Sequence, residues 1–397
     1  MFERTKVSLF IALALLAVVG WALGSFEVPE ADGTSTPVLQ KYAYYYDVLI
    51  GIGIAIILAV SLNLVNGHTG QFSLGHAGFM AVGAYFASMV TMGIQFPLVV
   101  YPEFAGTEWH FGILKAIGWV LALALNSIIG FLNILVGGAH ALAGPAQFFA
   151  ALLVGGVAAA ITGILVGAPS LRLKGDYLAI VTLGFNEIIR VVMQNAKEVG
   201  GETGLAGIPQ HTNFFWTFAF AAVTIYVVGN LVNSTYGRGF LAVRDDEVAA
   251  EAMGINTTKY KVLAFVTGAF FAGIAGGLYA HFKQYIVPEG FNFMMSINIV
   301  VMVILGGMGN TVGVIFAAIL LTILPEALRE LAESRWVIDT TNWLTNDLPP
   351  ERQGAVLDRV QDFFRNRMIF FSLILIMVML LRPQGLFTRS QRRLERK

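Results

Sequence analysis

Long runs of apolar residues dominate the chain, and the polar residues gather in short stretches between them. A helix needs roughly 20 mostly apolar residues to cross the hydrocarbon core of a bilayer. Continuous runs of this kind are typical of membrane helices, whereas a membrane β-barrel alternates apolar and polar positions. The pattern therefore predicts an all-α polytopic membrane protein. Eleven segments are candidates for a crossing: residues 7–24, 48–64, 73–91, 116–136, 148–168, 177–193, 214–231, 262–281, 296–306, 312–331 and 368–381.

Lysine and arginine cluster in four stretches outside these segments, and cytoplasmic loops are the ones enriched in such residues. The rule places both termini and all four stretches in the cytoplasm, so an even number of crossings must precede Arg172. Five candidate segments lie there. We expect segment 116–136, which contains Asn126 and Asn133, not to cross, which leaves about ten transmembrane helices. The clustered residues are Arg4, Lys6, Arg172, Lys174, Arg238, Arg244, Lys259, Lys261 and the six between Arg382 and Lys397.

The composition agrees with a membrane protein and argues against several other classes. Hydrophobic residues fill 56% of the 397 positions and charged residues only 13%, against about a quarter charged in soluble domains. A net charge of zero offers no basic field for nucleic acid. The absence of cysteine excludes disulfides, iron–sulfur clusters and thiol catalysis. The first run, 7–24, is long for a signal peptide and lacks a good cleavage site, so an uncleaved helix is expected.

Two glycine-rich stretches interrupt the apolar pattern, one in each half of the chain. Residues 66–75 read NGHTGQFSLG and residues 305–313 read LGGMGNTVG. Irregular backbone at membrane depth survives only where protein or a water-filled cavity satisfies it, and paired broken helices are typical of transporters. We therefore expect glycine-broken helices in both halves. Close helix packing, within the chain or between chains, is predicted at the Gly-x-x-x-Gly pairs Gly163/Gly167 and Gly273/Gly277.

Two loops between the apolar segments carry helical patterns of their own. Loop 332–365 is polar and ends with apolar residues at helical spacing, which predicts an external loop with an amphipathic helix. In loop 238–260, Asp245, Asp246 and Glu247 suit a helix N-terminus, and Gly254 suits a helix end. Such a short helix between two spans is either a docking surface for a soluble partner or a solvated connector.

Four stretches together resemble the LivM-like permeases of branched-chain amino acid ABC importers. They are GHTGQFSLGHAGFMAVGAYFAS (67–88), LRLKGDYLAIVTLGFNEIIRVV (171–192), RDDEVAAEAMGINTTKYKVLAFVTGAFFAGIAGGLYAH (244–281) and RPQGLF (382–387). The resemblance covers most of the chain from about residue 45, in the family's order. Segment 116–136 looks like an insertion, and loop 332–365 is longer than the family pattern.

The resemblance implies a single transmembrane permease domain, 1–397, that works as one subunit of a larger importer in the bacterial inner membrane. Its partners would be a second homologous permease, two cytoplasmic ATPases, a periplasmic solute-binding protein and membrane lipid. The chain has no G-x-x-x-x-G-K-[ST] motif, so we expect it to be no enzyme, with no cofactor or metal of its own and ATP bound by the partners. Coupling to the ATPase would involve Arg244, Asp245, Glu247, Ala250, Glu251 and Gly254.

Polar residues inside two of the spans are candidates for the translocation pathway, because such groups are costly in a membrane and usually face an interior path. One set lies on 177–193 and the other surrounds the first glycine stretch. The alternatives are interhelical hydrogen bonds, a snorkelling Arg190 at the interface, and a packed, hydrogen-bonded His76. The candidates are Asn63, Gln71, Ser73, His76, Thr182, Asn186, Glu187 and Arg190.

The sequence favours import of branched-chain or related amino acids by ATP-driven alternating access, in which the helix at 245–253 receives the push. Urea or short amides are the alternative cargo. A gradient-driven transporter or channel is a further alternative, with Glu187 and Arg190 as its only clear relay candidates. A membrane enzyme has little support, since no catalytic triad, metal motif or paired carboxylates lie at depth. The sequence does not reveal the cargo.

Overall fold

The computed structural model describes residues 43–94, 130–171, 173 and 175–333, two short strands nearer the N-terminus, and isolated residues elsewhere. The part of the chain it describes is mostly helical. The helices are α3 (Ala43–Asn63), continued by a π-helix (Leu64–His68), α4 (His76–Met92), α6 (Gly144–Ser170), α7 (Asp176–Asn195), α8 (Phe214–Val232), α9 (Thr235–Asp245), α10 (Glu247–Ala252), α11 (Thr257–Lys283), α12 (Phe293–Gly306) and α13 (Thr311–Glu333). Short 3-10 turns occupy Lys197–Val199, Gly201–Thr203 and Pro288–Phe291, the last labelled η5.

Two small antiparallel ribbons accompany the helices, so the described part is not purely α-helical. β1 (Glu27–Pro29) pairs with β2 (Ser35–Pro37), with Glu27 opposite Pro37. β3 (Leu205–Ala206) pairs with β4 (Tyr285–Ile286), with Leu205 opposite Ile286. The second ribbon joins the loop after α7 to the loop after α11.

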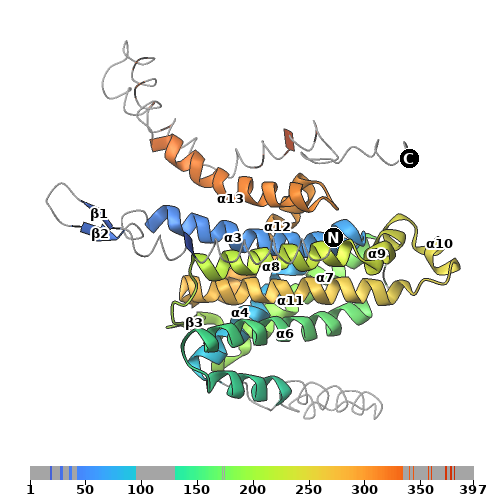
Figure 1. Ribbon diagram of the computed structural model, residues 1–397, viewed down its shortest axis with the longest axis horizontal. Helices are drawn as coiled ribbons and strands as arrows, with labels where there is room; N and C mark the ends of the chain where they lie inside the picture. The colour runs from blue at the N-terminus through green and yellow to red at the C-terminus, as the bar shows by residue number, and fades with distance from the viewer. Residues whose placement is uncertain are drawn as a thin grey trace.

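The long helices run side by side, with α10 at one end of the bundle and the β3–β4 ribbon at the other (Figure 1). We call these the α10 end and the ribbon end. Tyr46 near the start of α3 accepts a hydrogen bond from Phe214 N at the start of α8, which places both starts at the ribbon end. Successive helices α3, α4, α6, α7, α8, α11, α12 and α13 then alternate in direction. This alternation is the one required of consecutive membrane crossings.

Seven helical segments of the described residues are long and apolar enough to cross a membrane: Ala43–His68, Gly144–Ser170, Tyr177–Asn195, Phe214–Val232, Thr257–Lys283, Pro288–Gly306 and Thr311–Glu330. They coincide with seven of the predicted segments. An eighth, predicted at 73–91, is α4, which is shorter and begins only at His76. The predicted spans 7–24 and 368–381, loop 332–365 and the basic C-terminus lie wholly or almost wholly outside the described residues.

The core is built around α4, in which every residue from His76 to Val90 is buried. Glycines let α4, α6 and α11 approach until their backbones touch. A Cβ added at Gly83 would lie 2.1 Å from Gly273 O, and one at Gly276 would lie 1.9 Å from Met80 O. Small residues allow this approach, which maximises dispersion contacts where the lipid supplies no hydrophobic drive.

The two Gly-x-x-x-Gly pairs pack inside the chain, between α6 and α11 and against α4. A Cβ at Gly163 would meet Ala269, and one at Gly273 would meet Ala159 and the backbone of Gly155. The prediction of close packing is therefore confirmed, and its setting is the interior of one chain.

The described residues on either side of the gap at 95–129, Ile94 and His140, both lie at the ribbon end. The Nδ1 atom of His140 lies 2.8 Å from Val90 O, so the end of α4 and the approach to α6 are neighbours. Residues 130–140 form a helix there, while 95–129 lie outside the described residues. An even number of crossings, zero included, is consistent with these ends, and the non-crossing 116–136 stays a prediction.

Candidate functional site

The first glycine stretch forms a hairpin at the α10 end of α3. The helix loosens into a π-helix at Leu64–His68, and Gly70 then turns the chain with φ +68°. Residues after the turn run back along the helix, since Gln71 N donates to Val65 O at 3.1 Å. The span predicted to begin at residue 73 therefore starts three residues later, because residues 71–75 precede α4. We call these residues the return segment. π-Helical turns are rare and often occur at functional sites.

The second glycine stretch forms the tight turn between α12 and α13, and it meets the first. Gly309 N donates to the side-chain oxygen of Asn63 at 2.9 Å. A Cβ at Gly67 would lie 2.1 Å from that oxygen and 2.3 Å from Gly309 N, so only glycine fits. We call Asn63, Gly67 and Gly309 the glycine junction. It links two segments that are 246 residues apart in sequence.

Arg244, the penultimate residue of α9, lies against this junction. Its Cγ atom would be 2.9 Å from a Cβ at Gly70, and its Nη1 atom 3.3 Å from a Cβ at Gly309. Its Nε and Nη2 atoms donate to Asp245 Oδ1 at 3.1 and 3.0 Å. The helix α9, which forms the first part of loop 238–260, is thus in contact with both glycine stretches.

Several buried polar atoms around the junction have no hydrogen-bond partner within the described part of the chain. They are Asn63 Nδ2, His68 Nε2 and both side-chain polar atoms of Gln71. These side chains are 0–5% exposed. An unsatisfied buried polar atom costs about 1–3 kcal/mol, so a group of them suggests a partner such as water, an ion or a ligand.

The return segment is fixed to α7 by residues that the sequence predicts to line the translocation pathway. Thr182 Oγ1 accepts from Leu74 N at 3.0 Å, and a Cβ at Gly75 would lie 2.6 Å from Thr182 O. Ser73 is held through its backbone N, which donates to Asn66 Oδ1 at 3.2 Å. Thr182, a candidate on segment 177–193, therefore contacts the return segment, which contains the candidates Gln71 and Ser73.

Loop 238–260 contains two helices, α9 and α10, rather than one. Asp245 ends α9, and Asp246 caps α10, accepting from Val248 N at 2.9 Å and Ala249 N at 3.0 Å. The helix expected over 245–253 is correspondingly shorter, at Glu247–Ala252. The reason is that the Asp246 side chain satisfies the first amides of a new helix and breaks the old one. Gly254, with φ +81°, ends α10 as predicted.

The inner face of α10 is fixed to α11 by charged and polar contacts. Lys261 Nζ lies 2.6 Å from Glu247 Oε1, and the two side chains are only 7% and 21% exposed. Thr257 Oγ1 donates to Glu251 Oε1 at 2.7 Å, and Ala250 is buried. Glu247, Glu251 and Ala250 therefore position the helix within this chain.

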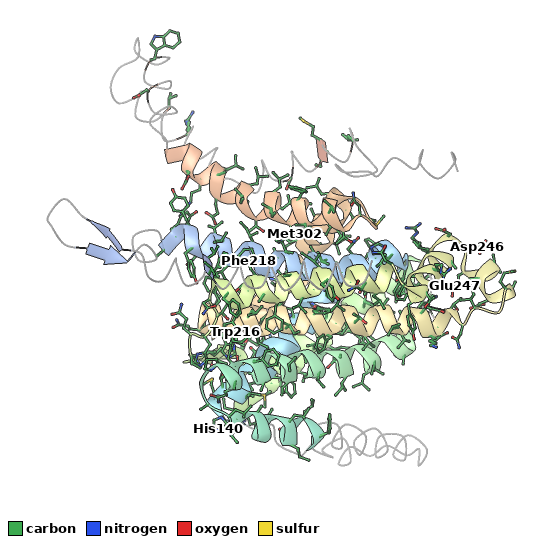
Figure 2. All side chains as sticks on the ribbon, viewed as in Figure 1. His140, Trp216, Phe218, Asp246, Glu247 and Met302 are labelled. Atoms are coloured by element: carbon green, nitrogen blue, oxygen red, sulfur yellow. The ribbon has the colours of Figure 1, made fainter. Side chains whose placement is uncertain are left out.

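Val248 of α10 and Met253 at its C-cap are two exposed apolar side chains that the sequence pattern does not single out. Met253 is 83% exposed and Val248 is 66% exposed. Two apolar residues five positions apart do not form a helical apolar pattern, so the local sequence does not identify them as a surface. Figure 2 places Asp246 and Glu247 of this loop at the end of the molecule opposite Trp216 and His140. Exposed apolar side chains on such a projection suit a protein partner.

Comparison with known protein families identifies the family of this chain. The model of the branched-chain amino acid transport system permease component matches residues 44–379. The chain belongs to this permease family. The match covers both glycine stretches and the α9–α10 loop.

Individual relatives agree with the family assignment. The permease is 29% identical to the high-affinity branched-chain amino acid transport system permease protein LivM of Escherichia coli K12, over 99% of this chain and 78% of the relative. It is 27% identical to a probable LivM of Methanocaldococcus jannaschii, over 67% and 76%. It is also 25% identical to LivH of E. coli K12, over 67% and 79%. No solved structure matches. With its apolar helices, the permease is a multi-pass membrane protein.

The remaining predicted pathway residues of the permease lie nearer the ribbon end or are enclosed. His76 is 2% exposed, and its Nε2 atom lies 2.9 Å from Ser61 Oγ, as expected for a packed histidine. Asn186 donates to Phe291 O at 3.4 Å, while its Oδ1 atom has no partner in the described part. A pathway role for either residue stays a prediction.

Glu187 and Arg190 of the permease form an ion-pair cluster between α7 and η5. Arg190 Nε lies 2.7 Å from Glu187 Oε2, and Arg190 Nη1 contacts Glu289. Glu187 and Arg190 are three positions apart, the spacing of neighbours on one helix face, whereas Glu289 is 99 positions away from Arg190 and has no local sequence signal. The cluster ties two elements together near the ribbon end.

Proposed function

We propose that the chain is one of two related transmembrane subunits of an ATP-driven importer for branched-chain amino acids. The family match and the names of the relatives support this cargo. Similarity to both LivM and LivH supports the pairing of two homologous permeases. Its setting would be the bacterial cytoplasmic membrane, with α10 and both termini in the cytoplasm and a solute-binding protein at the ribbon end.

The observation that carries this proposal is the construction of α10. The helix projects from the α10 end, exposes Met253 and Val248, and is held to α11 by the pair of Lys261 and Glu247. A connector of no function would need neither feature. We infer that each of two ATPase subunits binds such a helix, one from each permease.

Alternating access would follow from the contacts that leave α10 and its neighbour α9. Movement of α10 reaches α11 through Lys261 and Thr257, and movement of α9 reaches both glycine stretches through Arg244. Closure of the ATPases would therefore shift α11 against α3 and rearrange the junction. Interfaces packed at backbone contact switch between discrete arrangements rather than deforming continuously.

A gradient-driven mechanism is less supported, because its only relay candidates are engaged with each other. Arg190 is paired with Glu187 and Glu289. Short amides or urea remain the alternative cargo, and transport with the cognate binding protein separates them from amino acids.

The test is uptake of radiolabelled L-leucine into proteoliposomes that contain the whole complex, binding protein and ATP. Met253→Asp should lower uptake and ATP hydrolysis by about 10-fold or more, because central apolar contacts dominate interface energy. Met253→Leu, which keeps an apolar side chain, should behave as the unaltered chain. Equal activity of both variants would refute docking through α10, and uptake without any ATPase subunit would refute ATP-driven transport.

A further inference from the structure

We propose that Arg244, Asn63, His68 and Gln71 form a binding site for the carboxylate of the transported solute beside the glycine junction. This inference rests on the proposed function, since it assumes that a solute passes the junction. It adds a specific chemical class of ligand group and a location at the α10 end of the bundle.

The first support is a group of buried polar side-chain atoms without hydrogen-bond partners in one hairpin, the amide donors of Asn63 and Gln71 among them. Asn63 Nδ2, His68 Nε2 and Gln71 Nε2 are all buried and find no partner among the described residues. Each side chain is at least 95% buried, so bulk water does not satisfy them. All three belong to the hairpin of residues 63–71, whose tip at Gly70 contacts Arg244.

The second support is the position of the Arg244 guanidinium between Asp245 and Gly309. The guanidinium uses Nε and Nη2 for Asp245, and its Nη1 atom lies on the side of Gly309. Asn63 approaches Gly309 from the hairpin, through the 2.9 Å hydrogen bond to its backbone nitrogen. Arg244 and Asn63 thus meet at Gly309, and a cation beside a neutral amide suits a carboxylate, since charge-assisted hydrogen bonds are the strong ones.

The remaining unpartnered atom of the cluster suits the other charge of an amino acid. Gln71 Oε1 is a buried acceptor without a partner in the described part of the chain. It offers an oxygen to an ammonium group, whereas the donors take the carboxylate. A neutral amide such as urea cannot form with Arg244 the hydrogen bonds between opposite charges that a carboxylate forms, so the site favours a zwitterionic amino acid.

The position of Arg244 makes such a site sensitive to the ATPase. The residue lies two positions before Asp246, which begins α10, so a displacement of α10 displaces the guanidinium from the junction. Loss of that one cation would weaken the carboxylate site and release solute toward the α10 end. Binding and coupling would then use the same residue.

The experiment measures binding of radiolabelled L-leucine to the complete complex in lipid nanodiscs, without binding protein, in the nucleotide-free and the ATP-bound state. We expect 4-methylpentanoate, which keeps the carboxylate, to compete, and L-leucinamide, which lacks it, not to compete. Arg244→Gln should weaken binding by about 10-fold or more, because a hydrogen bond to a charged group is lost. Arg244→Lys should retain part of the affinity.

The matched control is Arg238→Gln, an exposed arginine on the same helix, which should bind as the unaltered chain does. Leucine binding that is equal in Arg244→Gln, equal competition by the amide, or no binding in either state would overturn the site. ATP-dependent uptake by the unaltered complex with its binding protein is measured in parallel. Its absence would refute the proposed function, whereas its presence without Arg244-dependent binding would refute only the carboxylate site.

Discussion

Gly83→Ala should strongly destabilise the folded chain. A methyl group there would lie 2.1 Å from Gly273 O and 2.2 Å from Gly273 Cα, which belong to the backbone of α11. Backbone cannot rotate aside as a side chain can, so α4 and α11 must separate. Overpacking typically costs about 1–3 kcal/mol, and here it also breaks the contacts of α6 with both helices. Thermal unfolding of the purified protein in detergent measures the effect.

A matched variant isolates packing from helix propensity. Gly184 lies in α7, and an added Cβ would meet nothing within 4 Å. Gly184→Ala should therefore leave stability unchanged or raise it by about 0.5–1 kcal/mol, since alanine restricts the unfolded chain and favours a helix. If Gly83→Ala is as stable as Gly184→Ala, the close seam of α4, α6 and α11 is wrong.

Glu247→Gln should disconnect ATP hydrolysis from transport while the chain still inserts. The substitution leaves Lys261, only 7% exposed, as a charge without its carboxylate. Removing one partner of a buried ion pair costs about 3–5 kcal/mol, and the 21% exposure of Glu247 places the expected cost near the lower figure. That energy displaces α10 from α11, so leucine uptake should fall by about 10-fold or more.

A double variant distinguishes a positioning role from direct contact with a partner. Lys261→Met removes the buried charge, so Glu247→Gln with Lys261→Met should recover much of the uptake lost by Glu247→Gln alone. A Glu247 carboxylate that binds the ATPase directly would give no recovery, and normal coupling in Glu247→Gln would contradict the role of the pair. Glu251→Gln should have the smaller effect, because the amide oxygen of glutamine can still accept the hydrogen bond from Thr257.

The membrane spans could be predicted because each depends on a continuous local run of about 20 apolar residues. Every described helix that is long enough to cross lies on a predicted apolar segment, and small discrepancies concern their ends. The start of α4 was predicted too early because residues 73–75 are apolar or small, although they belong to the non-helical return segment. Their conformation depends on Thr182 in another helix, which no local pattern reveals.

The candidate site could be predicted only in part, because its contacts also depend on residues that are distant in sequence. Loop 238–260 was identified from its charges and glycine, but the exposed side chains of α10 depend on which face α11 covers. The contact of Asn63 with Gly309 joins the two glycine stretches, whose sequences share little beyond glycine and polar residues. Sequence suggested that each stretch mattered, and only the fold brings them to one place beside Arg244.

The structure also changes the meaning of the predicted coupling residues. Glu247, Glu251 and Ala250 face this chain, whereas Met253 and Val248 face outward. The charged residues would determine where α10 sits, and the apolar ones would determine what binds it. This division explains why a family pattern with acidic residues and alanines suits a helix that must be both fixed and exposed.

The most direct test of the account is a crosslink from α10 to the ATPase. The chain has no cysteine, so Met253→Cys introduces a single reactive site in it. A heterobifunctional maleimide–photoreactive reagent at this position should join the permease to an ATPase subunit, identified by mass spectrometry of the adduct. Tyr285→Cys, exposed at the ribbon end, should give no such adduct. An ATPase adduct from position 285, or none from position 253 in an active complex, would contradict the assignment of α10 as the coupling helix.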